Sequence, residues 1–298
     1  ITVWHVLALS VFQGLVNAFD TPARQAFVVE MVDDREHLAN AIALNSSMVN
    51  AARLLGPSIA GLLIAAVGEG WCFFIDAVSY LAVIASLLLM RLRPRAAAAH
   101  APKHVLVELR EGFRYAASFA PIRSILLLLA LVSFTGIPYT VLMPIFASQV
   151  LHGGANTLGL LMAATGVGAV VGALWLASRR SVLGLGRTLC VAGALFGAGL
   201  IAFACSRWLF VSVALLIVTG GGMMVQMAAS NTLLQTLVDE DKRGRVMSFY
   251  TMAFFGMMPF GSLTAGWLGE RIGAPATVAW GGAATLVAVA LFARKLPE

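Results

Sequence analysis

Three ionisable side chains, Asp20, Arg24 and Arg53, lie within long apolar runs of this 298-residue sequence. A charge at the centre of a membrane costs about 2.5–3.5 kcal/mol on insertion scales, so each group needs a partner or a function. An aspartate can bind and release a proton there, and a neighbouring arginine lowers its affinity for that proton. Two interpretations stay open: the three groups neutralise one another permanently, or Asp20 is a protonation or substrate site that a movable arginine controls.

Helix geometry allows both arginines to reach Asp20. Counted from the turn near Arg35 at about 1.5 Å per residue, Asp20 lies about 22 Å along its helix and Arg53 about 27 Å along the next one. Asp20 and Arg24 share one face of a single helix. Pro22, between them, removes a backbone donor and predicts a bend in that helix.

The composition places these helices in a membrane. Hydrophobic residues make up 60% of the chain and charged residues only 11%, whereas soluble domains carry roughly 25% charged residues. Apolar runs of about 20 residues, long enough to span a bilayer as helix, recur throughout. The sequence therefore predicts an all-α integral membrane protein with nine spans, at residues 2–31, 39–67, 71–92, 121–150, 157–178, 184–204, 207–235, 244–270 and 274–294.

Basic residues predict the orientation of these spans. The loop from Arg91 to Arg123 is rich in arginine, whereas the breaks at 68–70 and 151–159 contain neither lysine nor arginine. The positive-inside rule makes the long loop cytoplasmic and the two breaks external. The net charge of +6 is thus assigned to cytoplasmic loops, and no nucleic acid is expected as a partner.

Cysteine usage predicts no metal site. Cys72, Cys190 and Cys205 lie far apart in apolar segments, without the spacing of a metal site or a disulfide framework. They are interpreted as inert thiols, and neither a metal nor another cofactor is expected.

An internal repeat predicts the domain organisation. The glycines of GPSIAG (56–61) and Gly68 match those of GSLTAG (261–266) and Gly273 at a constant offset of 205 residues. Parallel repeats of this length are typical of transporters built from two six-helix halves. The nine spans are therefore predicted to be the fourth to twelfth of twelve, with the first three missing. Residues 1–92 would complete the first half, 93–120 the cytoplasmic linker and 121–298 the second half.

Three stretches carry a resemblance to the major facilitator superfamily. ARLLGPSIAGLL (52–63) is similar to the glycine-proline motif in the fifth helix of its antiporters. Residues 20–31 and 229–266 resemble a bacterial branch that includes the enterobactin exporter and related transmembrane secretion effectors. The resemblance has a departure: SVFQG (10–14) carries Ser10 where drug–proton antiporters have an arginine. An arginine-based proton step is not carried over to that position.

The resemblance implies residues that line a central cavity and residues that change conformation. Each polar candidate taken alone is also open to a simpler interpretation, a hydrogen bond between helices. The lining candidates are Gln13, Asn17 and Asp20 on the fourth helix, Ser133, Thr135 and Tyr139 on the seventh, and Gln226, Asn231 and Gln235 on the tenth. The conformational motif comprises Gly56, Pro57 and Gly61 with Arg243, Gly244 and Arg245.

Methionines gather on the predicted tenth and eleventh helices. Their flexible thioethers could form an adaptable wall for a bulky apolar substrate, and ordinary packing is the alternative. They are Met223, Met224, Met227, Met252, Met257 and Met258.

The function that follows is secondary active transport, by alternating access, of a small lipophilic molecule such as a siderophore, drug or metabolite. The expected protein is a monomeric, proton-coupled exporter in the bacterial cytoplasmic (inner) membrane. No Walker motif, HExxH or GxSxG occurs in the sequence, so neither ATP-driven pumping nor an intramembrane enzyme is expected. The alternative is a non-transporting or inactive truncated membrane protein.

Overall fold

The computed structural model describes residues 66–90, 114–179 and 183–294 continuously, and residues 4–5, 8–17, 20, 48, 52, 56, 59 and 63 before them. The chain divides into two units, residues 1–53 with 78–99 and residues 54–77 with 100–298. Within the described residues of the first part, Ala8–Asn17 forms a short apolar helix. Helix α3 (Glu69–Leu89) follows.

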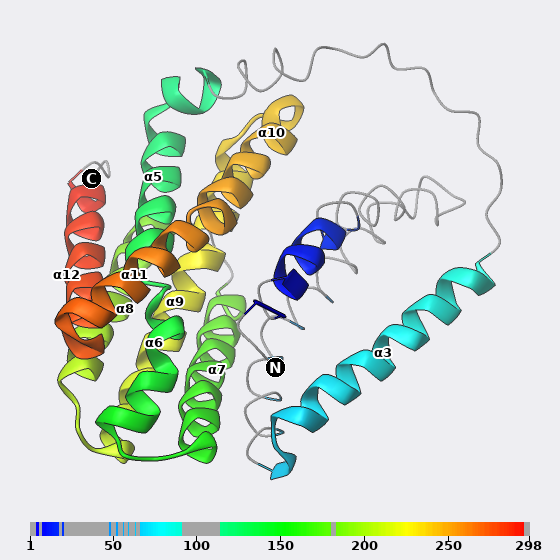
Figure 1. The fold of residues 1–298 in the computed structure, drawn as a ribbon. Helices are drawn as coiled ribbons and strands as arrows, with labels where there is room; N and C mark the ends of the chain where they lie inside the picture. The colour runs from blue at the N-terminus through cyan, green and yellow to red at the C-terminus, as the bar shows by residue number, and fades with distance from the viewer. Residues whose placement is uncertain are drawn as a thin grey trace. The chain divides into compact units, whose positions relative to one another are not determined.

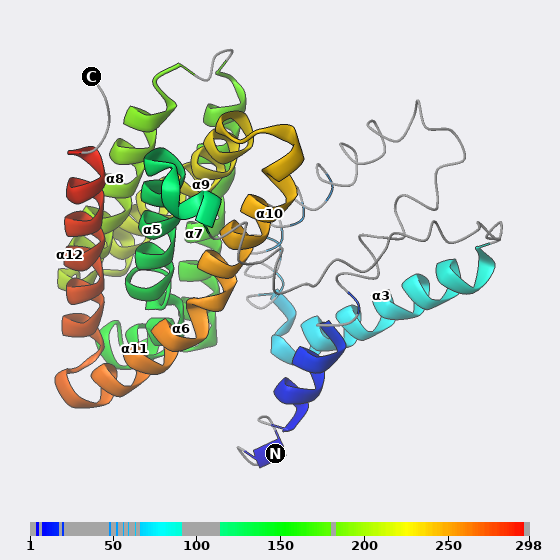
Figure 2. The same cartoon turned by 90° about the horizontal axis from the view of Figure 1, so that it is seen from above.

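The C-terminal part of the chain, residues 114–294, is a bundle of helices (Figure 1). In chain order the elements are α5 (Ala120–Thr135), α6 (Tyr139–Ile145), η1 (Phe146–Val150), α7 (Ala155–Ala177), α8 (Leu185–Cys205), α9 (Leu209–Leu237), α10 (Glu240–Thr251), η2 (Met252–Gly256), α11 (Met258–Ile272) and α12 (Ala274–Ala293). Within this bundle, α9 packs on α7 and α8, and α12 packs on α8 and α5. Elements α10, η2 and α11 form one long rod that slants across the other helices (Figure 2).

The described residues contain 7 helical segments long and apolar enough to cross a membrane. They lie at residues 70–89, 120–150, 155–177, 185–205, 209–237, 245–272 and 274–293, and they confirm the last seven predicted spans. Apolar side chains also cover the outside of the bundle: Phe210 is 85% exposed and Leu263 is 73% exposed. Large exposed apolar surfaces mark contact with a membrane or with a partner protein, and the apolar helices of this bundle favour the membrane.

The span at residues 120–150, predicted as one helix, is interrupted. Helix α5 ends at Thr135, and Gly136 and Ile137 both donate their backbone N–H to the Val132 carbonyl before α6 begins. Pro138 caps α6 and Pro144 lies inside it. Proline removes a backbone donor and bends a helix, so this span consists of the short consecutive elements α5, α6 and η1.

The basic residues gather at one end of the bundle. Figure 1 shows the start of α5, α10 and the C-terminus at the same end. The described arginines at this end are Arg114, Arg123, Arg179, Arg187, Arg245 and Arg294, whereas Arg207 and Arg271 lie at the other. We call these the basic end and the opposite end. The positive-inside rule predicts that the basic end faces the cytoplasm.

Glycines bring the helix backbones of the bundle together. A Cβ added at Gly168 on α7 would overlap the Ile217 carbonyl on α9, and one at Gly222 on α9 would lie 2.8 Å from the Ala192 carbonyl on α8. On α12, a Cβ at Gly282 would lie 2.6 Å from the Gly197 carbonyl of α8. Small residues at helix interfaces are typical of membrane bundles, because packing there cannot rely on exclusion of water.

Two of the repeated glycines share an unusual backbone conformation. Gly68 and Gly273, the matched positions of the predicted repeat, both have a φ of 85°. Residues that carry a Cβ rarely adopt this backbone conformation. Each glycine lies in a short turn between two helices, so the repeat extends from sequence to backbone geometry.

We expect Gly168→Ala to destabilise the bundle by about 1–3 kcal/mol, because the added Cβ cannot be accommodated without separating α7 from α9. The measurement is the thermal unfolding midpoint in detergent. Gly266→Ala is the control, since a Cβ at this position on α11 would have no neighbour within 4 Å, and alanine is the better helix former. Equal destabilisation by the two variants would contradict the packing described.

Candidate functional site

The polar candidates on the predicted seventh helix lie inside the bundle. Ser133 on α5 is fully buried, and Tyr139 at the start of α6 is 2% exposed. The Tyr139 ring meets Phe196 of α8 edge to face, with the ring centroids 6.2 Å apart. Thr135 is half-buried and donates a hydrogen bond to the Leu131 carbonyl, and its oxygen lies 3.4 Å from the Thr285 hydroxyl of α12.

The polar candidates on α9 separate into two groups. Gln226 is 2% exposed, and a Cβ added at Gly193 of α8 would lie 3.2 Å from its Oε1. Gln226 therefore faces α8 within the bundle. Asn231 and Gln235 lie nearer the basic end, where the Gln235 amide donates to Asn231 Oδ1. Asn231 is half-buried and Gln235 is exposed, so they are the α9 candidates open to the surroundings of the bundle.

Four buried side-chain oxygens in the described part of the chain have no hydrogen-bond partner. They belong to Ser133, Tyr139, Gln226 and Ser230. Thr165 is a polar neighbour of the Tyr139 hydroxyl, although no hydrogen bond joins them by strict geometry. Buried polar groups are normally paired, and leaving one unpaired costs about 1–3 kcal/mol. These oxygens are therefore places where a water or a moving helix could supply a partner.

Three of the six methionines singled out in the sequence pack against one buried apolar cluster. A small buried cluster consists of Leu129 on α5, Ile137 between α5 and α6, and Phe254 on η2. Further apolar side chains pack against it. These are Met223, Met227, Tyr250, Ala253 and Met258. The Tyr250 hydroxyl donates to the Met227 carbonyl across 3.3 Å, which ties α10 to α9. We call this cluster the methionine face, and it joins α5, α9 and the α10–η2–α11 rod.

The remaining methionines divide between this face and its surroundings. Met252 is 58% exposed, while Met224 and Met257 are half-buried. Element η2, which carries Met252, is a π-helix that lies just before Pro259. A π-turn in a helix shifts the hydrogen-bonding register, is easily strained and is frequent at functional sites. The methionine face therefore borders the most irregular part of its rod.

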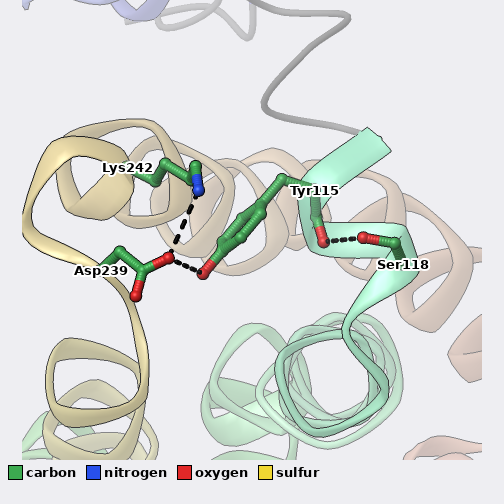
Figure 3. Close-up of polar contacts among 4 residues, drawn as sticks. All are labelled: Tyr115, Ser118, Asp239 and Lys242. Carbon is green, nitrogen blue, oxygen red and sulfur yellow. Dashed lines mark hydrogen bonds and ion pairs between the residues drawn. The ribbon is translucent and has the colours of Figure 1, made fainter.

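A polar cluster at the basic end was not predicted from the sequence (Figure 3). The Tyr115 hydroxyl donates to Asp239 Oδ2 across 3.3 Å, and Lys242 Nζ lies 3.3 Å from the same oxygen. Lys242 also lies over the Tyr115 ring, 4.6 Å from its centroid. The cluster joins the segment that enters α5 to the turn between α9 and α10. We call it the basic-end cluster.

The sequence indicates one part of the basic-end cluster but not its partner. The acidic and basic stretch DEDKR at 239–243 is evident, but its partner Tyr115 lies 124 residues earlier in the chain. The predicted motif residues Arg243 and Gly244 lie in α10, directly after Lys242, and Arg245 follows in the same helix. The motif is thus placed beside the cluster.

The candidates of the N-terminal part are placed only in part. Gln13 and Asn17 lie in the helix Ala8–Asn17, and both are exposed there. Asp20 is exposed, and Gly56 is half-buried. Arg24, Arg53, Pro57 and Gly61 lie outside the described residues, so their predicted roles stay predictions.

We expect Asp239→Ala to release the segment that enters α5 while changing the free energy of unfolding by less than about 1 kcal/mol, because surface ion pairs contribute little. Hydrogen exchange of the amides of residues 114–119 should become faster. Glu270→Ala, which removes an exposed carboxylate at the opposite end, should leave that exchange unchanged. Unchanged exchange in Asp239→Ala would show that the cluster does not hold the segment.

The unpaired oxygens generate a second prediction. We expect Gln226→Leu and Ser230→Ala to keep or raise the thermal unfolding midpoint, because each removes a buried oxygen without a partner. Ser212→Ala is the matched control on the same helix, since Ser212 donates to Ser206 Oγ across 2.9 Å in a buried position. Its loss should cost about 0.6 kcal/mol. A larger loss for Ser230→Ala than for Ser212→Ala would reveal a bound partner.

Two known proteins are similar to this chain, one in sequence and one in fold. The staphyloferrin A transporter of Staphylococcus aureus (strain NCTC 8325 / PS 47) is 24% identical over 264 residues, which cover 87% of this chain and 64% of that protein. The chain thus spans less than two thirds of the length of this curated relative. The crystal structure of a bacterial homologue of the human lysosomal transporter Spinster, inward-facing and unoccupied, is similar in fold. Its TM-score is 0.50 at 18% identity, over 92% of this chain and 72% of that chain.

The family match covers the whole sequence. The family described as transmembrane secretion effector matches residues 1–298. This match and the two likenesses confirm the resemblance to the major facilitator superfamily and the all-α membrane fold. The chain is a multi-pass membrane protein that belongs to the transmembrane secretion effector family of the major facilitator superfamily.

Proposed function

We propose that the protein of which this chain forms part or all is a proton-coupled exporter of a small lipophilic molecule, working by alternating access in a bacterial cytoplasmic membrane. The observation that carries the proposal is the methionine face, a packed apolar cluster with partly buried, flexible methionines, in a chain of a transporter family. Methionine-rich surfaces repack around ligands of different shapes. A siderophore, a drug or a lipophilic metabolite would suit such a surface, and the relative's name favours a siderophore.

The bundle provides a body that can move as a unit. Its helices touch backbone to backbone at glycines such as Gly168 and Gly222, and close packing of this kind resists internal deformation. Two of the irregular points of the bundle, the break at 136–138 and the π-helix η2, adjoin the methionine face. In this proposal the bundle, as the predicted half 121–298, rocks against residues 1–92, while these two points adjust to the substrate.

The basic-end cluster has a role in this cycle. Asp239 and Lys242 lie where α9 turns into α10, and Tyr115 lies where the predicted linker 93–120 enters α5. A contact that ties the linker to this turn would favour one position of the basic end. Opening the basic end would then break this surface contact. Breaking it costs less than about 1 kcal/mol, which is small enough for a reversible cycle.

Proton coupling is assigned to Asp20 with Arg24 and Arg53. A carboxylate that loses an arginine partner during the cycle takes up a proton more readily. Coupling would follow if substrate binding and protonation compete for that carboxylate. The alternative interpretation, permanent neutralisation by the two arginines, gives a protein that holds its helices in register without coupling.

We expect Asp20→Asn to reduce flux driven by a pH gradient by about tenfold or more, because an amide cannot bind the coupling proton. The measurement is uptake or efflux in proteoliposomes of the full-length protein. Asp76→Asn is the control, since Asp76 lies on α3, which the predicted numbering makes the sixth helix and not one of the helices assigned lining residues. Unchanged flux in Asp20→Asn would remove Asp20 from the mechanism. Absence of flux in a folded wild-type protein would favour the alternative of a non-transporting membrane protein.

A further inference from the structure

A groove on the bundle is not used by the transport proposal. It has a volume of about 690 Å³ and lies between α7 and α8, with α9 as its floor. The floor is made by Ile217, Val218 and Gly221, and apolar residues such as Val171 and Leu195 form the walls. Glycines bring α9 close to both neighbouring helices, which makes α9 the floor of the groove.

The groove has the length of one membrane leaflet. Its lining extends from Gly168 on α7 to Arg179, which follows that helix, and this length is about 16 Å at roughly 1.5 Å per residue. This is about half of a hydrocarbon core of roughly 30 Å. The groove therefore runs from the middle of the membrane to the basic end, the path of a lipid chain from one leaflet.

The mouth of the groove at the basic end is positively charged. Arg179, Arg187 and Thr188 line it, and the segment from Ser178 to Thr188 contains no acidic residue. Arg179 donates to Thr188 and to the Leu183 carbonyl and lies over the Trp175 ring, 5.5 Å from its centroid. Among the described residues, nothing pairs with the exposed guanidinium of Arg187.

The start of α8 adds to this attraction. Helix α8 begins at Leu185 after Gly184, whose φ is 74°, and its first backbone N–H groups point toward the mouth end of the helix. A helix N-terminus favours negative charge by roughly 0.3–1 kcal/mol. The two arginines and the helix terminus thus meet where an acyl chain leaves the apolar groove.

We propose that the groove is a binding site for an anionic phospholipid of the phosphatidylglycerol type. One acyl chain lies on the floor formed by α9, and the phosphate lies between Arg179 and Arg187. Trp175, 49% exposed at the groove wall, holds the interfacial position that tryptophan favours. A zwitterionic lipid would fill the same groove, but its headgroup would not match the net positive mouth.

The test compares lipid binding to the full-length protein by native mass spectrometry from micelles containing phosphatidylglycerol and phosphatidylcholine. We expect wild type to retain phosphatidylglycerol preferentially, and Arg179→Gln and Arg187→Gln each to lower its affinity about fivefold, since one basic residue near a membrane surface contributes about 1 kcal/mol. The paired control is Arg207→Gln with Arg271→Gln, arginines of the opposite end, which should leave the preference intact.

A second variant tests the groove itself. Val171→Phe fills it from a side chain that is 57% exposed, and Val287→Phe is the control at a 59% exposed position on α12. Val171→Phe should reduce bound phosphatidylglycerol, and Val287→Phe should not. Equal retention of both lipids by wild type would overturn the proposal. A change of oligomeric state in Val171→Phe with unchanged lipid binding would also overturn it, because the groove would then hold a second copy of the chain.

Discussion

The bundle depends on the approach of helix backbones at glycine. Between α7 and α9, α8 and α9, and α8 and α12, a carbonyl of one helix occupies the space that a Cβ of the other would need. In a membrane this contact replaces the hydrophobic driving force that packs soluble helices, because lipid chains are as apolar as the side chains. The groove between α7 and α8 follows from these contacts, because they hold α9 close to both helices.

The tight contacts leave the irregular segments as the places that can change. Pro138 and Pro144 interrupt the span at 120–150, and the π-helix η2 interrupts the rod before Pro259. The break beside Pro138 and the π-helix η2 border the methionine face, whereas α7, α8 and α9 are continuous helices. Rigidity and adaptability are thus separated within one bundle. A substrate surface can then adjust without loosening the contacts that hold the bundle together.

Composition predicted the spans well, because lipid requires long apolar helices whatever their partners are. It could not predict the side that each helix turns inward. Helices α7, α9 and α12 carry apolar residues on every side, so periodicity did not show that Gln226 faces Gly193 while Gln235 lies exposed. The glycine repeat was predicted and reappears as matching φ angles at Gly68 and Gly273. The contact of Tyr115 with Asp239 was missed, since it joins residues 124 positions apart.

The glycine contacts also determine which mutations of the glycine codons the protein can tolerate. Every single-base change that replaces a glycine codon by another amino acid introduces a residue with a Cβ. At Gly168, Gly222 and Gly282 each such change meets a carbonyl of the neighbouring helix, so no conservative replacement is one mutation away. At the open positions Gly256 and Gly266 the same changes meet no neighbour within 4 Å. Tolerance to random mutation should therefore vary sharply among glycines that look alike in the sequence.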